Sequence, residues 1–177
     1  MTGNGETAIL AGGCSWIMQQ LLRHPEGVIS TSVGWAGGEG DNPTEGDPQG
    51  HAEAVQVLFD PERLSYRELL EYFFMIHRAD LGEEVVGSLY RSEIFCTSDE
   101  QRRVAEETIA DVDAACHWLG KTVTRVTEAG RFLEDPATNQ DYLLRFPDRP
   151  EGTEPPLPRT GVEAFGQGSP IDAGARG

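Results

Sequence analysis

The hydrophobic pattern of the chain switches between the two-residue period of strands and the wider period of amphipathic helices. Short apolar or β-rich runs predict strands over residues 7–11, 28–35, 51–59, 88–95 and 122–126. Helices are predicted over 15–23, after the capping-box sequence Ser65-Tyr66-Arg67-Glu68, after the capping pair Ser98 and Gln101, and near 139–145. The two longer helices carry apolar stripes: Leu69, Leu70, Phe73, Ile76 and His77 in the first, and Val104, Ile109, Val112, Cys116 and Leu119 in the second.

The order strand-helix-strand-strand-helix-strand predicts an α+β fold, a two-layer sandwich with a split-βαβ (ferredoxin-like) core and a mixed sheet. We expect one domain over residues 1–146, which is long enough to bury a substantial core. Residues 147–177 contain six of the eleven prolines and six glycines, with few large apolar groups. Such a segment can bury little surface, so we expect an extended C-terminal tail that lies over the domain or is partly disordered.

Residues 36–50 are rich in glycine, proline and acidic residues and predict a long loop between two strands. A loop of this length inside a compact domain is usually functional or mobile.

Charge and composition narrow the classes of partner. Fourteen Lys and Arg residues against 30 Asp and Glu give a net charge of -16 at pH 7, which opposes binding to nucleic acid or to an anionic membrane surface. No apolar run has the length of a membrane span, and residues 1–6 lack the basic and apolar regions of a signal peptide. The three cysteines are far apart in sequence, which predicts neither a disulfide framework nor a zinc ribbon. These features favour a cytoplasmic protein.

Cys14 stands where a predicted strand ends and a predicted helix begins. The apolar residues 8–11 lead into Gly12-Gly13, and Cys14 directly precedes the helix over 15–23. A helix N-terminus favours anions, and the anion here can be the thiolate of Cys14 itself. Cys14 is therefore a candidate nucleophile, and the alternative on this segment alone is a buried, unreactive cysteine.

Glu53 lies on the more hydrophobic face of the strand predicted over 51–59. Alternation places it with Val55, Val57 and Phe59, whereas alanines dominate the start of the other face. Burial would raise the pKa of this carboxyl group and favour its protonated form, which can act as a general acid near neutral pH. The alternative is a glutamate near a strand end that reaches solvent or pairs with an arginine.

Two aromatic residues on predicted strands, Trp35 and Tyr90, would ordinarily be core residues with a satisfied polar tip. Tyr90 is expected on the same strand face as Ser92 and Ile94. Arg91 and Glu93 share the opposite face and are expected to form a structural ion pair.

A metal site is not expected. His51 and Glu53 have the His-x-Glu spacing of zinc deaminases, but no Pro-Cys-x-x-Cys follows them. The other three histidines have no ligand spacing to one another. Cys116, on an apolar helical stripe, is predicted to be a core cysteine.

Several short motifs occur in order along residues 6–146: Gly13-Cys14-x-Trp16, Gly27-Val28-x-Ser30-Thr31-x-Val33-Gly34-Trp35-Ala36-Gly37-Gly38, Asn42-Pro43-Thr44, Gly50-His51-Ala52-Glu53-Ala54-Val55, Phe59-Asp60-Pro61 and Tyr90-Arg91-Ser92. This combination resembles the A-type peptide methionine sulfoxide reductases. A series of motifs in one order is far more specific than a single cysteine motif.

The resemblance implies a catalytic domain that reduces methionine S-sulfoxide, free or peptidyl, with a thiol as reductant. It implies that Cys14 attacks the sulfoxide sulfur as a thiolate and becomes a sulfenic acid, while Glu53 protonates the oxygen. The positions of Trp35 and Tyr90 are implied in oxygen binding and that of Trp16 in the pocket for the substrate methyl group. These positions and His51 of the same motifs are the expected substrate-binding residues.

Three departures from the family pattern lie on the substrate side. Ser15 stands where the family usually has Phe, Trp35 where it has Tyr, and Val85 where it has a substrate-contacting Asp. Ser15 exchanges part of an aromatic pocket for a hydroxyl group, and Trp35 keeps an N–H donor but loses an acceptor. Since Cys14 and Glu53 are retained, these changes concern the substrate more than the reaction.

Recycling of Cys14 is predicted to need an external thiol. Many family members carry resolving cysteines in the tail, but residues 147–177 contain none. Cys96 lies six residues beyond Tyr90, roughly 20 Å along a strand, and Cys116 is expected in the core. The expected partners are therefore a sulfoxide substrate and a thioredoxin-like or low-molecular-weight thiol, with no cofactor besides.

Three functions are compatible with these residues. The first is the methionine sulfoxide reductase that the resemblance implies. The second is a diverged enzyme in which Cys14 and Glu53 act on a different sulfoxide or oxidised small molecule. The third is a non-catalytic domain in which Cys14 senses redox conditions, and ordinary thiol reactivity of Cys14 would favour it.

Overall fold

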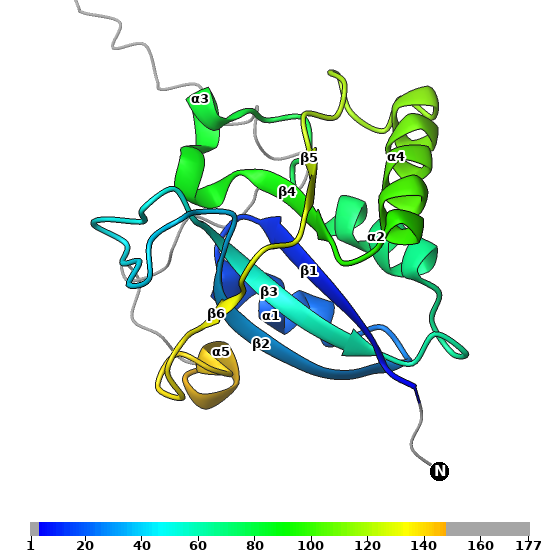
Figure 1. The fold of residues 1–177 in the computed structure, drawn as a ribbon. Coiled ribbons are helices and arrows are strands. Elements are labelled where there is room, and N and C mark those ends of the chain that lie inside the picture. The colour runs from blue at the N-terminus through cyan, green and yellow to red at the C-terminus, as the bar shows by residue number, and fades with distance from the viewer. Residues whose placement is uncertain (1–3, 148–177) are drawn as a thin grey trace, which may run out of the picture.

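The structure is a computed structural model that describes residues 4–147 (Figure 1), so the predicted tail lies outside the described residues apart from Pro147. The elements are β1 (Glu6–Gly12), α1 (Ser15–Leu22), β2 (Val28–Ala36), β3 (Ala52–Phe59), α2 (Tyr66–Ile76), α3 (Glu83–Val86), the 3₁₀ helix η1 (Ser88–Tyr90), β4 (Ser92–Cys96), α4 (Asp99–Ala114), β5 (Arg125–Glu128), β6 (Leu133–Glu134) and α5 (Tyr142–Arg145).

Six strands form one sheet in the order β5-β4-β1-β3-β2-β6. The four central strands pair antiparallel, and β3 lies between β1 and β2, the two strands that α1 connects. This is the split-βαβ arrangement, and β5, which runs parallel to β4, makes the sheet mixed. The predicted fold class is therefore confirmed. The strand predicted over 122–126 begins later, at Arg125, and the two-residue β6 was not predicted, because both are edge strands defined by their partners rather than by their own pattern.

Alternation along the strands separates two hydrophobic cores. On one face Leu10, Val55 and Phe59 pack against residues of α1 and α2 such as Met18 and Phe73, and Figure 1 shows these helices behind the sheet with α4 beside α2. The opposite face is lined by several alanines together with Ile9 and Phe95, and Ala129 and Phe132 pack against it. Burying each large apolar side chain stabilises the fold by about 1.5–3 kcal/mol.

The strand predicted over 88–95 is wrong in its first half. Residues Ser88–Tyr90 form η1, and β4 begins only at Ser92. Gly87 has a φ of 84°, and the Tyr90 N–H donates to the Gly87 carbonyl at 3.1 Å. This turn takes Tyr90 off the strand, so Tyr90 does not share a strand face with Ser92 and Ile94.

The helix α4 is shorter than its apolar stripe predicted. It ends at Ala114, and Cys116, with a φ of 51°, is left-handed and exposed. The left-handed residue interrupts the helical hydrogen bonds, and the Asp113 carboxylate accepts the Thr122 N–H at 2.7 Å as the chain turns back. The prediction of a core cysteine at 116 is therefore wrong, and Leu119 is 92% exposed.

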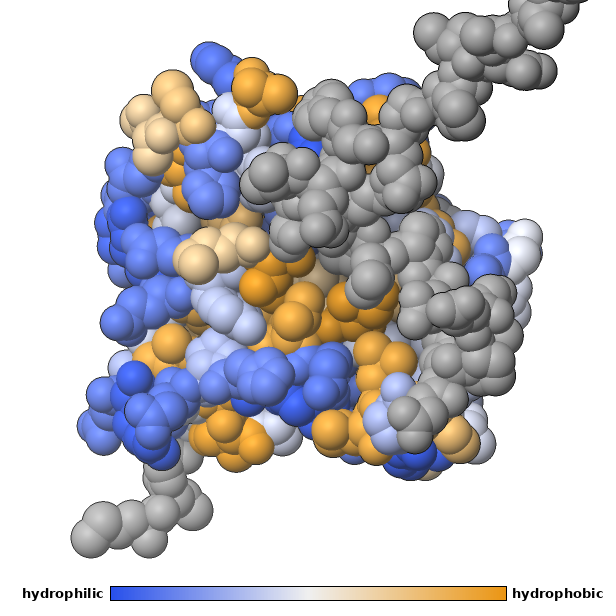
Figure 2. Space-filling view, turned by 180° about the vertical axis from the view of Figure 1, so that it is seen from behind, coloured by the Kyte–Doolittle hydropathy of each residue, from blue (hydrophilic) through white to orange (hydrophobic). Residues whose placement is uncertain are grey.

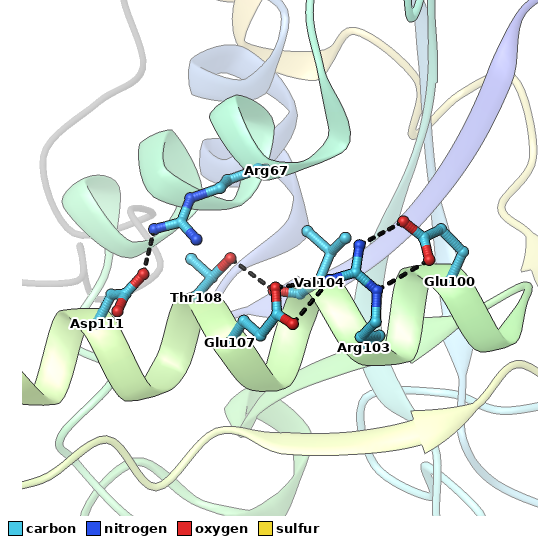
Figure 3. Close-up of polar contacts among 7 residues, drawn as sticks. All are labelled: Arg67, Glu100, Arg103, Val104, Glu107, Thr108 and Asp111. Atoms are coloured by element: carbon cyan, nitrogen blue, oxygen red, sulfur yellow. Dashed lines mark hydrogen bonds and ion pairs between the residues drawn. The ribbon is translucent and has the colours of Figure 1, made fainter.

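The outer surface of α4 is strongly charged. Arg103 pairs with Glu100 and Glu107 along the helix, and Arg67 of α2 reaches Asp111 (Figure 3).

Figure 2 shows the face seen from behind, where hydrophilic side chains gather at one side and hydrophobic ones near the centre. Among residues 4–147 no helix is both long and apolar enough to cross a membrane.

Candidate active site

Cys14 lies at the end of the turn that joins β1 to α1. Gly13 has a φ of 115°, a conformation that residues with side chains rarely adopt, and a side chain on Gly12 would meet the Phe73 ring at 2.8 Å. Cys14 is the N-cap of α1: its carbonyl accepts the Met18 N–H at 3.0 Å, but its side chain makes no capping hydrogen bond. The residue is 5% exposed, so its sulfur lies buried at the positive end of the helix dipole.

Glu53 reaches the same turn from β3. Its Oε2 accepts two hydrogen bonds from Ser15, one from the backbone N–H at 2.8 Å and one from the hydroxyl group at 3.0 Å. Because Ser15 directly follows Cys14, these bonds hold the carboxyl group beside the cysteine. The Ser15 N–H is one of the unpaired donors of a first helical turn, so Glu53 caps α1 where the Cys14 side chain does not.

The environment of Glu53 favours the protonated acid. Burial is the largest influence and raises the pKa of Glu53 above its ordinary value. The two hydrogen bonds from Ser15 lower this pKa, whereas the negative charges of Asp135 and Glu45 raise it. The net direction is upward, which suits a group that must donate a proton near neutral pH.

Tyr90 approaches the site from η1 and is half-buried. Burial raises the pKa of Tyr90 to about 12, and the charges of Glu53, Glu45 and Cys14 also raise it. Because η1 contacts β3 and the charges of Cys14 and Glu53 act on Tyr90, Tyr90 lies in the neighbourhood of both predicted residues. The Tyr90 hydroxyl group therefore keeps its proton at neutral pH and can donate a hydrogen bond.

Trp35 lies directly opposite Glu53 in the pairing of β2 with β3. Its indole N–H, which was expected to be available for a substrate, donates to Asp135 Oδ1 at 2.7 Å. The Asn139 side chain donates to the other oxygen of Asp135 at 3.1 Å. Neither Asp135 nor Asn139 was predicted as a site residue, because no motif or period marks the segment that follows β6.

Trp16 stacks on Tyr142 of α5, with ring centroids 4.0 Å apart and an angle of 11° between the planes. Asp141, which directly precedes α5, binds α1 and its C-cap. Its N–H donates to the Gln19 side chain at 3.0 Å, and its carboxylate pairs with the Arg23 guanidinium at 2.9 Å. Tyr142 was not predicted as a site residue. The sequence predicted a short helix near 139–145, but it did not indicate that this helix packs against α1.

His51 is buried, and its ring forms hydrogen bonds with the backbone of the 36–50 loop. Its Nδ1 accepts the Gly38 N–H at 3.1 Å, so its Nε2 carries the proton and donates to the Gly40 carbonyl at 2.8 Å. Both ring nitrogens are therefore occupied by the loop backbone rather than directed to a substrate.

The other two residues predicted to bind the substrate, Ser15 and Val85, differ in burial. Ser15 is 4% exposed and bonded to Glu53, so its hydroxyl group belongs to the surroundings of the acid. Val85 lies in α3, next to the 3₁₀ helix that carries Tyr90, and is 63% exposed.

The described residues hold no group of three or more His, Cys, Asp or Glu side chains that could bind a metal ion. None of the three cysteines is in a disulfide, and Cys96 is buried at the end of β4. Burial raises the pKa of the Cys96 thiol, which lowers its reactivity.

The fold and site define a class of protein. A buried cysteine at a helix N-terminus, with a carboxyl group of raised pKa held beside it, is the arrangement of an enzyme that uses a thiolate nucleophile and a general acid.

Comparison with known proteins agrees with this class and narrows it. A family model described as peptide methionine sulfoxide reductase matches residues 6–156. The MsrA of Nocardia farcinica is 56% identical over 144 residues, which are 80% of this chain and 85% of the relative. The MsrA of Streptomyces coelicolor is 48% identical over 151 residues, 84% of this chain and 88% of the relative.

Solved structures give the same result. The methionine sulfoxide reductase A of Corynebacterium diphtheriae has a TM-score of 0.69 at 28% identity, over 83% of this chain and 77% of that one. Reduced Mxr1 of Saccharomyces cerevisiae, at 24% identity, shares the fold with a TM-score of 0.75 over 90% of this chain and 95% of that one. The chain belongs to the peptide methionine sulfoxide reductase family, and identities near 50% make it an ordinary rather than a divergent member.

Proposed function

We propose that this protein is a thiol-dependent reductase of methionine S-sulfoxide, free or peptidyl, with Cys14 as the nucleophile and Glu53 as the proton donor. The observation that carries the proposal is the pair of hydrogen bonds from Ser15 to Glu53, which holds the acid next to Cys14. The family membership supports this substrate over a different sulfoxide or oxidised small molecule.

The reaction needs a thiolate and a proton in one place. The Cys14 thiolate, favoured by the helix N-terminus, attacks the sulfoxide sulfur with its electron pair, and Glu53 gives its proton to the oxygen. This attack joins the sulfur of Cys14 to the sulfoxide sulfur. Transfer of the hydroxyl group to Cys14 then forms the S–O bond of a sulfenic acid and breaks both the S–O bond of the substrate and the new S–S bond, so the thioether leaves. Glu53 is left as a carboxylate and takes a proton from solvent.

Recognition of the sulfoxide is assigned to the residues around this pair. The Tyr90 hydroxyl group donates to the sulfoxide oxygen, and its raised pKa keeps the donor protonated. The Trp16 ring, held flat against Tyr142, offers an apolar wall for the methyl group. Trp35 acts by holding Asp135, because its N–H is already donated, and His51 acts by shaping the loop.

Cys14 is regenerated by an external thiol in this proposal. One thiol attacks the sulfenic acid and releases water, and a second thiol reduces the mixed disulfide, so two thiols become one disulfide in each cycle. Mxr1 of Saccharomyces cerevisiae has been solved in complex with Trx2, which supports a thioredoxin-like reductant. Three cysteines without a disulfide fit a reducing compartment such as the cytoplasm.

The test is reduction of the separate S and R epimers of methionine sulfoxide, free and in a peptide, by the full chain with dithiothreitol or a thioredoxin system. We expect turnover of the S epimer and none in Cys14→Ser. Without reductant, one equivalent of thioether should form and a sulfenic acid should be trapped on Cys14 by a dimedone-type reagent.

Cys96→Ser and Cys116→Ser are the matched controls, because they remove the other two thiols and should retain turnover. Activity that survives in Cys14→Ser, or thioether formation without a trapped sulfenic acid, would contradict the proposal.

A further inference from the structure

Ser15 supplies two hydrogen-bond donors to one oxygen of Glu53. The backbone N–H and the hydroxyl group both lie within 3.0 Å of Oε2. Any residue except proline would supply the first donor, but the second depends on a hydroxyl side chain at this position. Ser15 is 4% exposed, so water does not readily replace its hydroxyl group.

The geometry distinguishes the two oxygens of the acid. An oxygen that accepts two hydrogen bonds is a poor site for the acid's own proton, so the proton of neutral Glu53 is carried by Oε1. When this proton leaves, the negative charge that develops on the carboxylate is stabilised by both donors on Oε2, because hydrogen bonds to a charged acceptor are about twice as strong as neutral ones.

We propose that Ser15 is a positioning residue for the proton donor: its N–H and hydroxyl group fix Glu53 by Oε2 and direct the protonated Oε1 to the sulfoxide oxygen. This inference rests on the proposed function, which supplies the reaction that Glu53 serves. It assigns a role to the side chain of Ser15 that goes beyond lining a pocket for the substrate methyl group.

Other charged and titratable groups also face Glu53 and must be separated from Ser15. They are Asp135 after β6, Glu45 in the 36–50 loop, Tyr90 on η1 and Cys14 at the start of α1. Asp135 and Glu45 raise the pKa of Glu53, whereas the hydroxyl group of Ser15 lowers it. Loss of this hydroxyl group therefore has the opposite sign from loss of either neighbouring carboxylate.

The experiment compares Ser15→Ala and Ser15→Gly, which lack the hydroxyl group, with Ser15→Thr, which retains it. Ser65→Ala is the matched control, because the Ser65 hydroxyl group donates to the Glu68 carboxylate at 2.8 Å in the cap of α2. For each full-length variant the Glu53 carboxyl carbon is titrated by NMR, with its signal identified by its absence in Glu53→Gln, and kcat and KM are measured.

We expect Ser15→Ala and Ser15→Gly to move the Glu53 titration to higher pH and to lower kcat about fivefold with little change in KM. Ser15→Thr should restore both values, and Ser65→Ala should change only stability. An unchanged Glu53 titration in both variants that lack the hydroxyl group would overturn the proposal, as would an equal change in Ser65→Ala.

The titration needs no substrate, so it separates this inference from the proposed function. If the wild-type chain fails to reduce methionine sulfoxide but Ser15→Ala still shifts Glu53, the positioning by Ser15 stands and the reaction is wrong. If the wild type is active and the titration does not move, the positioning by Ser15 is wrong and the reaction stands.

Discussion

Glu93→Gln is expected to destabilise the fold strongly, because it leaves a buried guanidinium group without its counter-charge. Arg91 and Glu93 are 6% and 5% exposed, and their Nε and Oε2 atoms are 2.6 Å apart. The predicted structural ion pair is thus confirmed. Arg91 also donates to the carbonyl groups of Ser88 and Gly50, at 2.9 and 3.1 Å, so the pair ties together the segments that lead to Tyr90 and Glu53.

The magnitude follows from burial. Removing one partner of a buried pair costs about 3–5 kcal/mol, whereas an exposed pair contributes about 0–1 kcal/mol. Arg103 and Glu107 of α4 (Figure 3) provide the comparison, since their atoms are 2.7 Å apart but their side chains are 55% and 53% exposed. Although the two distances are nearly the same, Glu93→Gln should lower the melting temperature by about 10 °C and Glu107→Gln by about 4 °C at most.

The assay is urea and thermal unfolding of both variants, followed by measurement of kcat/KM below the transition. Glu93→Gln should also lower activity, because Ser88 and Gly50 precede Tyr90 and Glu53 by a few residues. Equal losses of stability in the two variants would refute the reasoning, since they would show that burial does not decide the strength of the pair.

Three further predictions concern single groups. Asp135→Asn removes a like charge that raises the pKa of Glu53, so the Glu53 carboxyl NMR titration should move to lower pH; an upward shift would contradict this. Tyr90→Phe removes the proposed donor to the sulfoxide oxygen and should lower kcat about a hundredfold, and near-normal turnover would exclude that role. Burial lowers the pKa of His77 from 6.5 to about 4. Since the unfolded chain then binds a proton that the folded chain rejects, stability should fall by about 3 kcal/mol as pH drops from 6.5 to 4, and His77→Gln should unfold in urea with a weaker pH dependence.

Patterns over a few residues predicted most of the fold. The parity of β3 placed Glu53 with Val55 on the helix side, and Gly12-Gly13 marked the turn before α1, because both features depend only on neighbouring residues. The errors fell where a local pattern was interrupted by a turn. Tyr90 was assigned to a strand and Cys116 to the core, and left-handed residues at Gly87 and Cys116 decided otherwise.

The sequence by itself determined the four central strands and the helices α1, α2 and α4, and which of these elements carry Cys14 and Glu53. Only the tertiary structure decided which groups meet: Ser15 bonds to Glu53 across 38 residues of chain, and Trp35 to Asp135 across 100. Such contacts depend on the order of strands in the sheet and on the return of the chain beyond β6. Periodicity carries no information about either, since hydrogen bonds between distant segments leave no regular spacing in the sequence.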